Sequence, residues 1–161
     1  MTAETAFKIL SRTRQSLNEM IADLDDLALL KIPAGFNNNI LWNLGHVVVS
    51  QQLLSYHLSG LAVNVSEDLL SQFRRGSSPQ NWAKPINKTE LTELSLALVD
   101  KTLKDYRQGV FQESHRRETL FPYQTSFGGK LENFPDAVHF NNVHEGLHFG
   151  TIKLYKSLLN V

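Results

Sequence analysis

Two histidines lie four residues apart in the segment 141–150, which reads Asn-Asn-Val-His-Glu-Gly-Leu-His-Phe-Gly. On a helix, His144 and His148 would be about 40° apart around the axis and about 6 Å apart along it, so both imidazoles would point the same way. This spacing suits two ligands of one metal ion. Alternatively, the pair lines a polar groove and binds no metal.

The same residues match H-E-x-x-H, the zinc-peptidase signature, in which Glu145 would act as the general base. Peptidases with this signature take a third metal ligand, His or Glu, from further along the chain. The residues after His148 contain no His, Asp or Glu. The sequence therefore disfavours a zinc peptidase, and a third ligand has to come from an earlier segment.

His46 is the candidate for the third ligand, since it lies within an apolar segment that should form a largely buried helix. A single histidine there could be a core residue with a hydrogen bond at each nitrogen. In a four-helix bundle, however, the middle of this helix faces the middle of the last helix. Three imidazoles converging in an apolar interior would be unfavourable without a ligand for their lone pairs. The sequence therefore predicts a divalent metal site made of His46, His144 and His148.

Three further residues are candidates for supporting roles. Glu145 projects about 100° away from His144, so it could reach beside the metal as a catalytic base, or it could be a solvated or ion-paired helix residue. Asn43 and Asn141 each precede a candidate ligand by three residues, so their amides could orient an imidazole or a bound water, or could face solvent. The other histidines are interpreted as non-ligands: His57, His115 and His139.

The composition limits the class of protein. Sixteen basic and sixteen acidic side chains give no formal net charge with histidine neutral, so nucleic acid and anionic membranes are not expected partners. The chain has no cysteine, which excludes disulfides, a thiolate nucleophile and a cysteine-ligated zinc. No apolar run approaches the length that spans a bilayer, and the first residues lack the layout of a secretion signal, so the expected location is the cytoplasm.

Hydrophobic periodicity predicts an all-α protein, a four-helix bundle formed by a single domain, residues 1–161. Residues 3–30 are predicted to form one long helix, with Thr2 as its N-cap. Three more main helices are predicted, at residues 40–58, 89–108 and 135–159. Between them lie a long crossover, 61–85, and a short irregular or hairpin insert, 109–134, which should border the mouth of a site.

Three segments together resemble the DinB-like superfamily of metal-dependent proteins: residues 39–48, 73–79 and 144–152. The resemblance runs over nearly the whole chain, in order and spacing. It implies a four-helix bundle in which one histidine of the second helix and two of the last hold a divalent metal, zinc or nickel. These positions correspond to His46, His144 and His148 in this sequence.

The resemblance also sets expectations for function, because the family includes thiol-dependent S-transferases, isomerases and proteins called hydrolases, and many members are dimers. The expected function is that of a metal-dependent enzyme acting on a small molecule, as a thiol-dependent transferase or a hydrolase, with a low-molecular-weight thiol as a candidate partner. The alternative is a non-enzymatic, dimeric stress-response or binding bundle whose histidines line a polar cavity or hold a structural metal. Gly146 and Gly150 form a small-residue stripe that suggests a helix-packed homodimer.

Overall fold

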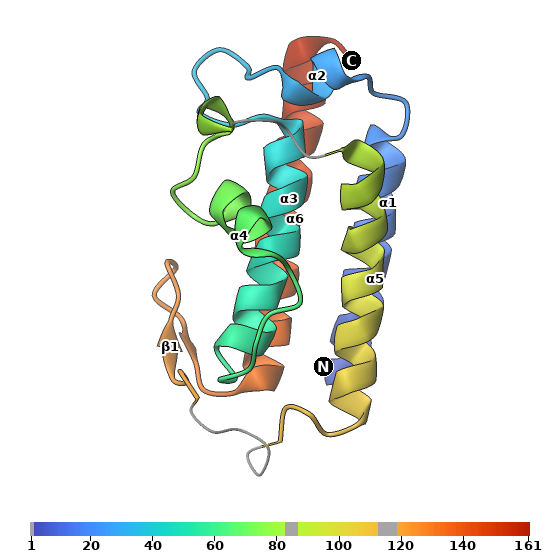
Figure 1. The fold of residues 1–161 in the computed structure, drawn as a ribbon. Helices are drawn as coiled ribbons and strands as arrows, with labels where there is room; N and C mark the ends of the chain where they lie inside the picture. Colours follow the sequence, from blue (N-terminus) through green and yellow to red (C-terminus); the bar gives the residue numbers. More distant parts are fainter. Residues whose placement is uncertain (1, 83–86, 113–118) are drawn as a thin grey trace.

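The computed structural model describes residues 2–82, 87–112 and 119–161. Four long helices lie side by side (Figure 1): α1 Ala3–Ile21, α3 Ile40–Gln52, α5 Lys88–Arg107 and α6 Phe134–Leu159. Helices α1 and α6 run in one direction and α3 and α5 in the other. Around the bundle α1 packs against α6, α6 against α3, α3 against α5 and α5 against α1. The predicted all-α bundle is confirmed.

The predicted helix 3–30 is wrong in its last third. Helix α1 begins after the N-cap Thr2, as predicted, but it ends at Ile21, and a separate short helix, α2 Asp26–Leu30, follows. The Asp25 side chain accepts a hydrogen bond from the Ala28 N–H at 2.8 Å, so it caps α2 and ends the first helix before it. Leu24 is still buried, which is why the apolar pattern continued across the break.

The second predicted helix exists, but its last turn is wider than an α-helix. Asn39 caps α3 by accepting a hydrogen bond from the Trp42 N–H at 2.7 Å. After Gln52 the chain continues as a π-helix, η1 Leu53–His57, in which the Leu58 N–H donates to the Leu53 carbonyl at 3.0 Å. Such π turns often lie at functional sites, and here Leu53 and Leu54 of the turn line the cavity described below.

The crossover and the insert also agree with their predictions. The crossover contains α4 Glu67–Phe73, capped by Ser66, and the 3₁₀ turn η2 Pro79–Asn81. The insert contains a two-stranded antiparallel hairpin, β1 Tyr123–Gln124 and β2 Lys130–Leu131. The crossover is long because α3 and α5 run parallel, so the chain has to return along the length of the bundle (Figure 1).

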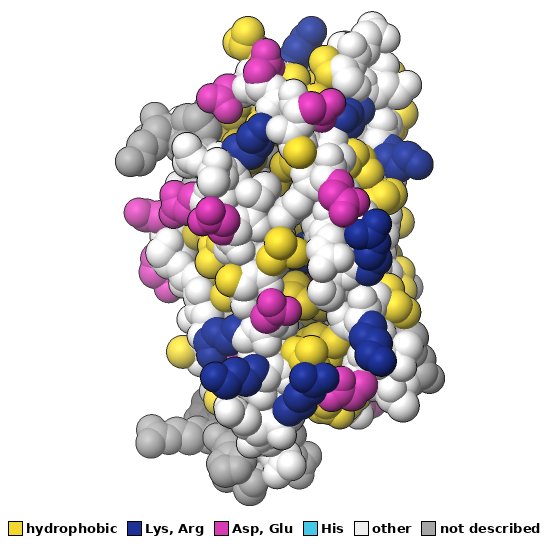
Figure 2. Space-filling model, turned by 90° about the vertical axis from the view of Figure 1, so that its right-hand side faces the viewer, with side chains coloured by type: hydrophobic (Ala, Val, Ile, Leu, Met, Phe, Trp, Pro, Cys, Tyr) yellow, Lys and Arg dark blue, Asp and Glu magenta, His cyan; other side chains and the backbone are white. Residues whose placement is uncertain are grey.

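The surface has no large area of one charge on the side of the bundle formed by α1 and α5. Figure 2 shows basic and acidic side chains scattered over this face, with apolar side chains between them. In the described parts of the chain, each helix is too short or too polar to cross a lipid bilayer.

Candidate metal centre

His46 on α3 and His144 and His148 on α6 converge in the interior of the bundle. Their ligand nitrogens all lie within 4.8 Å of one another. The ring centroid of His46 is 5.2 Å from that of His144 and 4.8 Å from that of His148, and the two rings on α6 are 4.7 Å apart. The predicted three-histidine group is therefore present and is compatible with a single metal ion.

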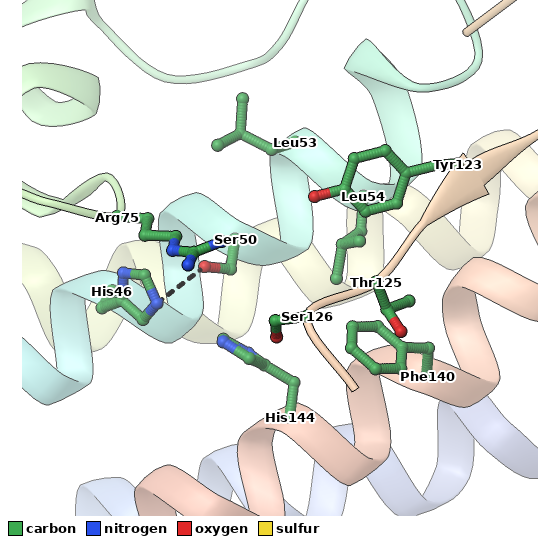
Figure 3. Close-up of a pocket in the computed structure, with 10 residues that line it drawn as sticks. All are labelled: His46, Ser50, Leu53, Leu54, Arg75, Tyr123, Thr125, Ser126, Phe140 and His144. Carbon is green, nitrogen blue, oxygen red and sulfur yellow. Dashed lines mark hydrogen bonds between the residues drawn. The ribbon is translucent and has the colours of Figure 1, made fainter. Parts of the chain in front are cut away.

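Helix α4 fixes the orientation of His46. Gly45 has no side chain, and a Cβ there would collide with the Phe73 ring, so this glycine lets α4 lie directly against α3. The Phe73 carbonyl then lies 2.6 Å from Nδ1 of His46. Because a carbonyl oxygen can only accept, Nδ1 carries the proton and Nε2 is the free nitrogen. Nε2 also lies 3.3 Å from the Ser50 hydroxyl (Figure 3).

Asn43 fixes the orientation of His148 across the helix interface. Its amide nitrogen donates to the Asn39 carbonyl at 2.8 Å, so its amide oxygen faces the other way and lies 2.8 Å from Nδ1 of His148. Nδ1 of His148 is therefore the donor and Nε2 is free. Metal-binding histidines commonly donate their second N–H in this way. The spacing left open whether Asn43 orients an imidazole or a bound water or faces solvent, and the structure places its amide oxygen against His148 on α6.

His144 has an atom without a partner. Its Nδ1 is buried and makes no hydrogen bond to any residue that the structure describes. A buried polar atom in this state is unfavourable unless it binds something. Three imidazoles, without thiolate or carboxylate, form a donor set that zinc and nickel both accept. The residues therefore fit a divalent transition metal.

Burial keeps the three imidazoles neutral. Removal from water lowers the pKa of His46, although the hydrogen bond with Phe73 acts in the opposite direction. Burial, together with the charge that the other imidazoles would carry, lowers the pKa of His144 to about 4 and that of His148 to about 3. Near neutral pH all three side chains are unprotonated at one nitrogen, which is the form that binds metal.

These pKa shifts make the metal-free protein sensitive to acid. In the unfolded chain histidine has a pKa of about 6.5. As the pH falls from there toward about 4, the unfolded chain binds protons that folded His144 and His148 do not, so we expect the free energy of unfolding to decrease. Urea denaturation of the metal-free protein at about pH 7.5 and about pH 5 measures this decrease. The His144→Ala/His148→Ala double variant should show a clearly smaller decrease in unfolding free energy. A decrease equal to that of the parent protein would contradict the assignment of the acid sensitivity to these two histidines.

Trp42 lies flat against His46, with ring centroids 4.6 Å apart and an interplanar angle of 10°. Its indole N–H donates to the Ser77 hydroxyl in the crossover at 2.9 Å. Trp42 therefore anchors the crossover to α3. Its stacking on His46 was not predicted, although both lie on one helix at a spacing of four residues, where side chains meet.

A role as catalytic base would require Glu145 to lie beside the metal centre. It does not lie there. Its side chain is fully buried in an ion pair with Arg14 of α1, in which the guanidinium Nε and Nη2 each lie 2.7 Å from a carboxylate oxygen. Glu145 is also not part of the group of potential ligands around the three histidines. Arg14 further donates to the carbonyls of Val47 and Ser95. The ion-paired alternative for Glu145 is therefore the one that the structure shows.

Arg14 is the residue that the sequence analysis missed. It lies four residues after Leu10 and three before Leu17, on the buried stripe of α1, and its side chain has no exposed surface. A buried arginine almost always has an acidic partner. An arginine at an apolar position of a helix was therefore a signal that an acidic side chain lies buried against α1.

Asn141 makes no hydrogen bond to any of the three imidazoles in the described part of the chain. Its amide nitrogen donates to Glu145 at 2.8 Å, and its amide oxygen is buried with no partner among the described residues. It therefore supports the ion pair and not the metal centre. Of the histidines interpreted as non-ligands, His57 and His139 are outside the three-histidine group, whereas His115 lies outside the described residues.

A cavity of about 150 Å³ opens beside the histidines (Figure 3). His46, Ser50 and His144 line one side of it, and η1 and α6 contribute apolar side chains. The crossover and the hairpin complete the wall, so the prediction that the insert borders a site agrees with the structure. The other lining residues are Leu53, Leu54, Arg75, Tyr123, Thr125, Ser126 and Phe140.

Comparison with known proteins identifies the family. The sequence pattern of the DinB superfamily matches residues 9–152, a range that includes all three histidines and most of the described helices. A search of curated proteins finds no significant match. The family match covers far more than half of the chain, and so the chain belongs to the DinB superfamily.

Proposed function

We propose that this protein is a metal-dependent enzyme in which His46, His144 and His148 hold one zinc or nickel ion and a small molecule binds in the adjoining cavity. The observation that supports this most strongly is that the three histidines converge beside a cavity large enough for a small molecule. A divalent ion at such a site supplies Lewis-acid chemistry, which lowers the pKa of a water molecule or of a thiol. The proposed reaction is a thiol-dependent transfer or a hydrolysis.

The residues around the histidines have defined tasks in this proposal. The Phe73 carbonyl and the Asn43 amide hold His46 and His148 so that each keeps Nε2 free for the ion. The Ser50 hydroxyl donates to the unprotonated Nε2 of His46 at 3.3 Å. Once the ion occupies this nitrogen, the hydroxyl is available to donate to a substrate atom beside the histidines. Leu53 and Leu54 cover one side of the cavity and limit the entry of water.

The rival proposal is a non-enzymatic bundle with a structural metal. A structural zinc site is normally closed by four protein ligands. Within the described ranges, the group around His46 comprises three histidines and no carboxylate. A site of three imidazoles next to a cavity has room for a substrate, and this favours the enzyme.

The test compares metal-free protein with protein loaded with zinc or nickel. Each form is incubated with a panel of electrophiles in the presence and absence of a low-molecular-weight thiol, and separately with esters and amides. We expect turnover that depends on the metal; dependence on added thiol assigns transfer, and turnover of esters or amides without thiol assigns hydrolysis. Metal that binds stoichiometrically without turnover in either panel would support the non-enzymatic bundle.

We also propose that the protein forms a homodimer through α6. Val143, Leu147, Leu154 and Leu158 are about half exposed and recur at a spacing suited to helix pairing. A methyl group added at Gly146 or Gly150 would meet nothing within 4 Å, so these glycines do not serve close packing within the described chain. We expect light scattering at micromolar concentration to give a dimer and the Leu154→Glu variant to be a monomer.

The control for this experiment is Leu27→Glu. Leu27 is 82% exposed and lies on the short helix α2, away from the stripe on α6. This variant should stay dimeric. A monomeric parent protein, or a Leu154→Glu variant that remains a dimer, would contradict the proposed interface.

A further inference from the structure

Arg75 lies at the edge of the cavity next to the three histidines. It follows α4, and the next residue, Gly76, has a φ of 86°, a conformation that turns the chain sharply and that favours glycine. Figure 3 shows the guanidinium of Arg75 pointing toward Ser50 on the His46 side of the cavity. The preceding arginine, Arg74, does not line this cavity. The chain therefore directs one of two adjacent arginines to the site.

The charge around the cavity favours an anion. Among its described lining residues, Arg75 is the one that carries a permanent charge, and none is acidic. A divalent ion held by the three histidines would add two further positive charges. Since the wall offers no carboxylate to balance them, a negatively charged ligand is the complement of this cavity.

The other lining groups limit the shape of that ligand. Leu53, Leu54 and Phe140 form an apolar surface, whereas Tyr123 and Ser126 of the hairpin contribute hydroxyl groups. A volume of about 150 Å³ admits only a small molecule. A ligand that satisfies these surfaces has a short apolar body and a compact anionic group.

We propose that the cavity binds a small aliphatic carboxylate. Its carboxylate pairs with the Arg75 guanidinium, whose parallel N–H donors match the two carboxylate oxygens. Its apolar body lies against Leu53, Leu54 and Phe140, which brings the rest of the molecule toward His144. This inference rests on the proposed function and deepens it, because it names the class of substrate that the enzyme takes and the residue that selects it.

The experiment compares two ligands of the same shape, isovalerate and isovaleramide, which differ in charge. Their binding is followed by NMR titration of the full-length protein, both metal-free and loaded with zinc. We expect isovalerate to bind at least about tenfold more tightly than the amide, because hydrogen bonds between charged groups are stronger than neutral ones. Arg75→Gln should abolish this preference, Arg75→Lys should keep part of it, and Arg74→Gln should leave it unchanged.

The metal-free series separates this inference from the proposed function. If zinc binds but isovalerate has no advantage over the amide, or keeps its advantage in Arg75→Gln, the carboxylate site is wrong and the metal centre stands. A preference that needs zinc and survives Arg75→Gln would mean that the carboxylate binds the ion, which also overturns the role of Arg75. If zinc does not bind and the preference still depends on Arg75, the proposed function fails and the carboxylate site remains.

Discussion

Replacing His46 with alanine should remove stoichiometric metal binding. The variant loses one of three protein ligands, and the two histidines left on α6 cannot enclose an ion alone. Changes to groups that only orient a ligand reduce metal affinity by about ten- to a hundredfold, so loss of a ligand itself should reduce it by at least about a hundredfold. Metal analysis after purification without a histidine tag, and competition with a chelator, measure the effect.

The matched control for His46→Ala is His57→Ala. His57 lies on η1, continuous with the helix that carries His46, but it is exposed and outside the three-histidine group. The His57→Ala variant should bind metal as the parent protein does. Trp42 offers a second readout, because its ring is stacked on His46. In a Trp82→Phe background, where Trp42 is the one tryptophan left, its fluorescence should change during a metal titration until one equivalent has been added. Full zinc occupancy in His46→Ala would show that the three-histidine site is wrong.

Replacing Glu145 with glutamine should destabilise the fold strongly and leave metal binding nearly intact. The change leaves the Arg14 guanidinium buried without its counter-charge, although its hydrogen bonds to the Val47 and Ser95 carbonyls remain. Breaking a buried ion pair from one side costs about 3–5 kcal/mol, which for a chain of this size lowers the thermal midpoint by roughly 10 °C. Chemical denaturation and metal analysis of the same sample measure the two effects.

Two controls identify the cause of that destabilisation. Glu19→Gln breaks an exposed ion pair with Arg12 and should change stability little, because solvent screens such pairs. The double variant Arg14→Met/Glu145→Leu removes both charges and should recover much of the lost stability. If Glu145→Gln were stable but bound no metal, or lost all activity while keeping both fold and metal, the peptidase-like role of Glu145 would regain support.

The positions of the three histidines could be predicted because the signals are mostly local. His144 and His148 are separated by about one helical turn, and His46 interrupts an apolar helix, so each pattern is visible within a few residues. Only the convergence of the three histidines depends on tertiary structure, and the geometry of a four-helix bundle was enough to predict it. Asn43 could be singled out by its spacing, although that spacing pointed to His46 and the side chain reaches across to His148.

The role of Glu145 could not be predicted in the same way. Its partner Arg14 is 131 residues away in the sequence, and which face of α6 meets α1 depends on how all four helices pack. The break after Ile21 was missed for a related reason. The cap at Asp25 competes with helix continuation, and the hydrophobic pattern alone favoured one helix because Leu24 and Leu29 are buried in their new orientation as well.

The π-helix η1 allows the cavity wall to change through a one-residue deletion. Its hydrogen bonds span five residues, so it holds one residue more than the α-helical turn it replaces. Loss of a single codon within 53–57 would turn these bonds into ordinary α-helical ones and leave the side chains after the turn in nearly the same orientation, so the change would be confined to the turn. Leu53 and Leu54 would be replaced or redirected in the cavity wall, while His46, one and a half turns or more earlier on α3, would keep its place. One in-frame deletion would therefore reshape the cavity wall and leave the three histidines in place.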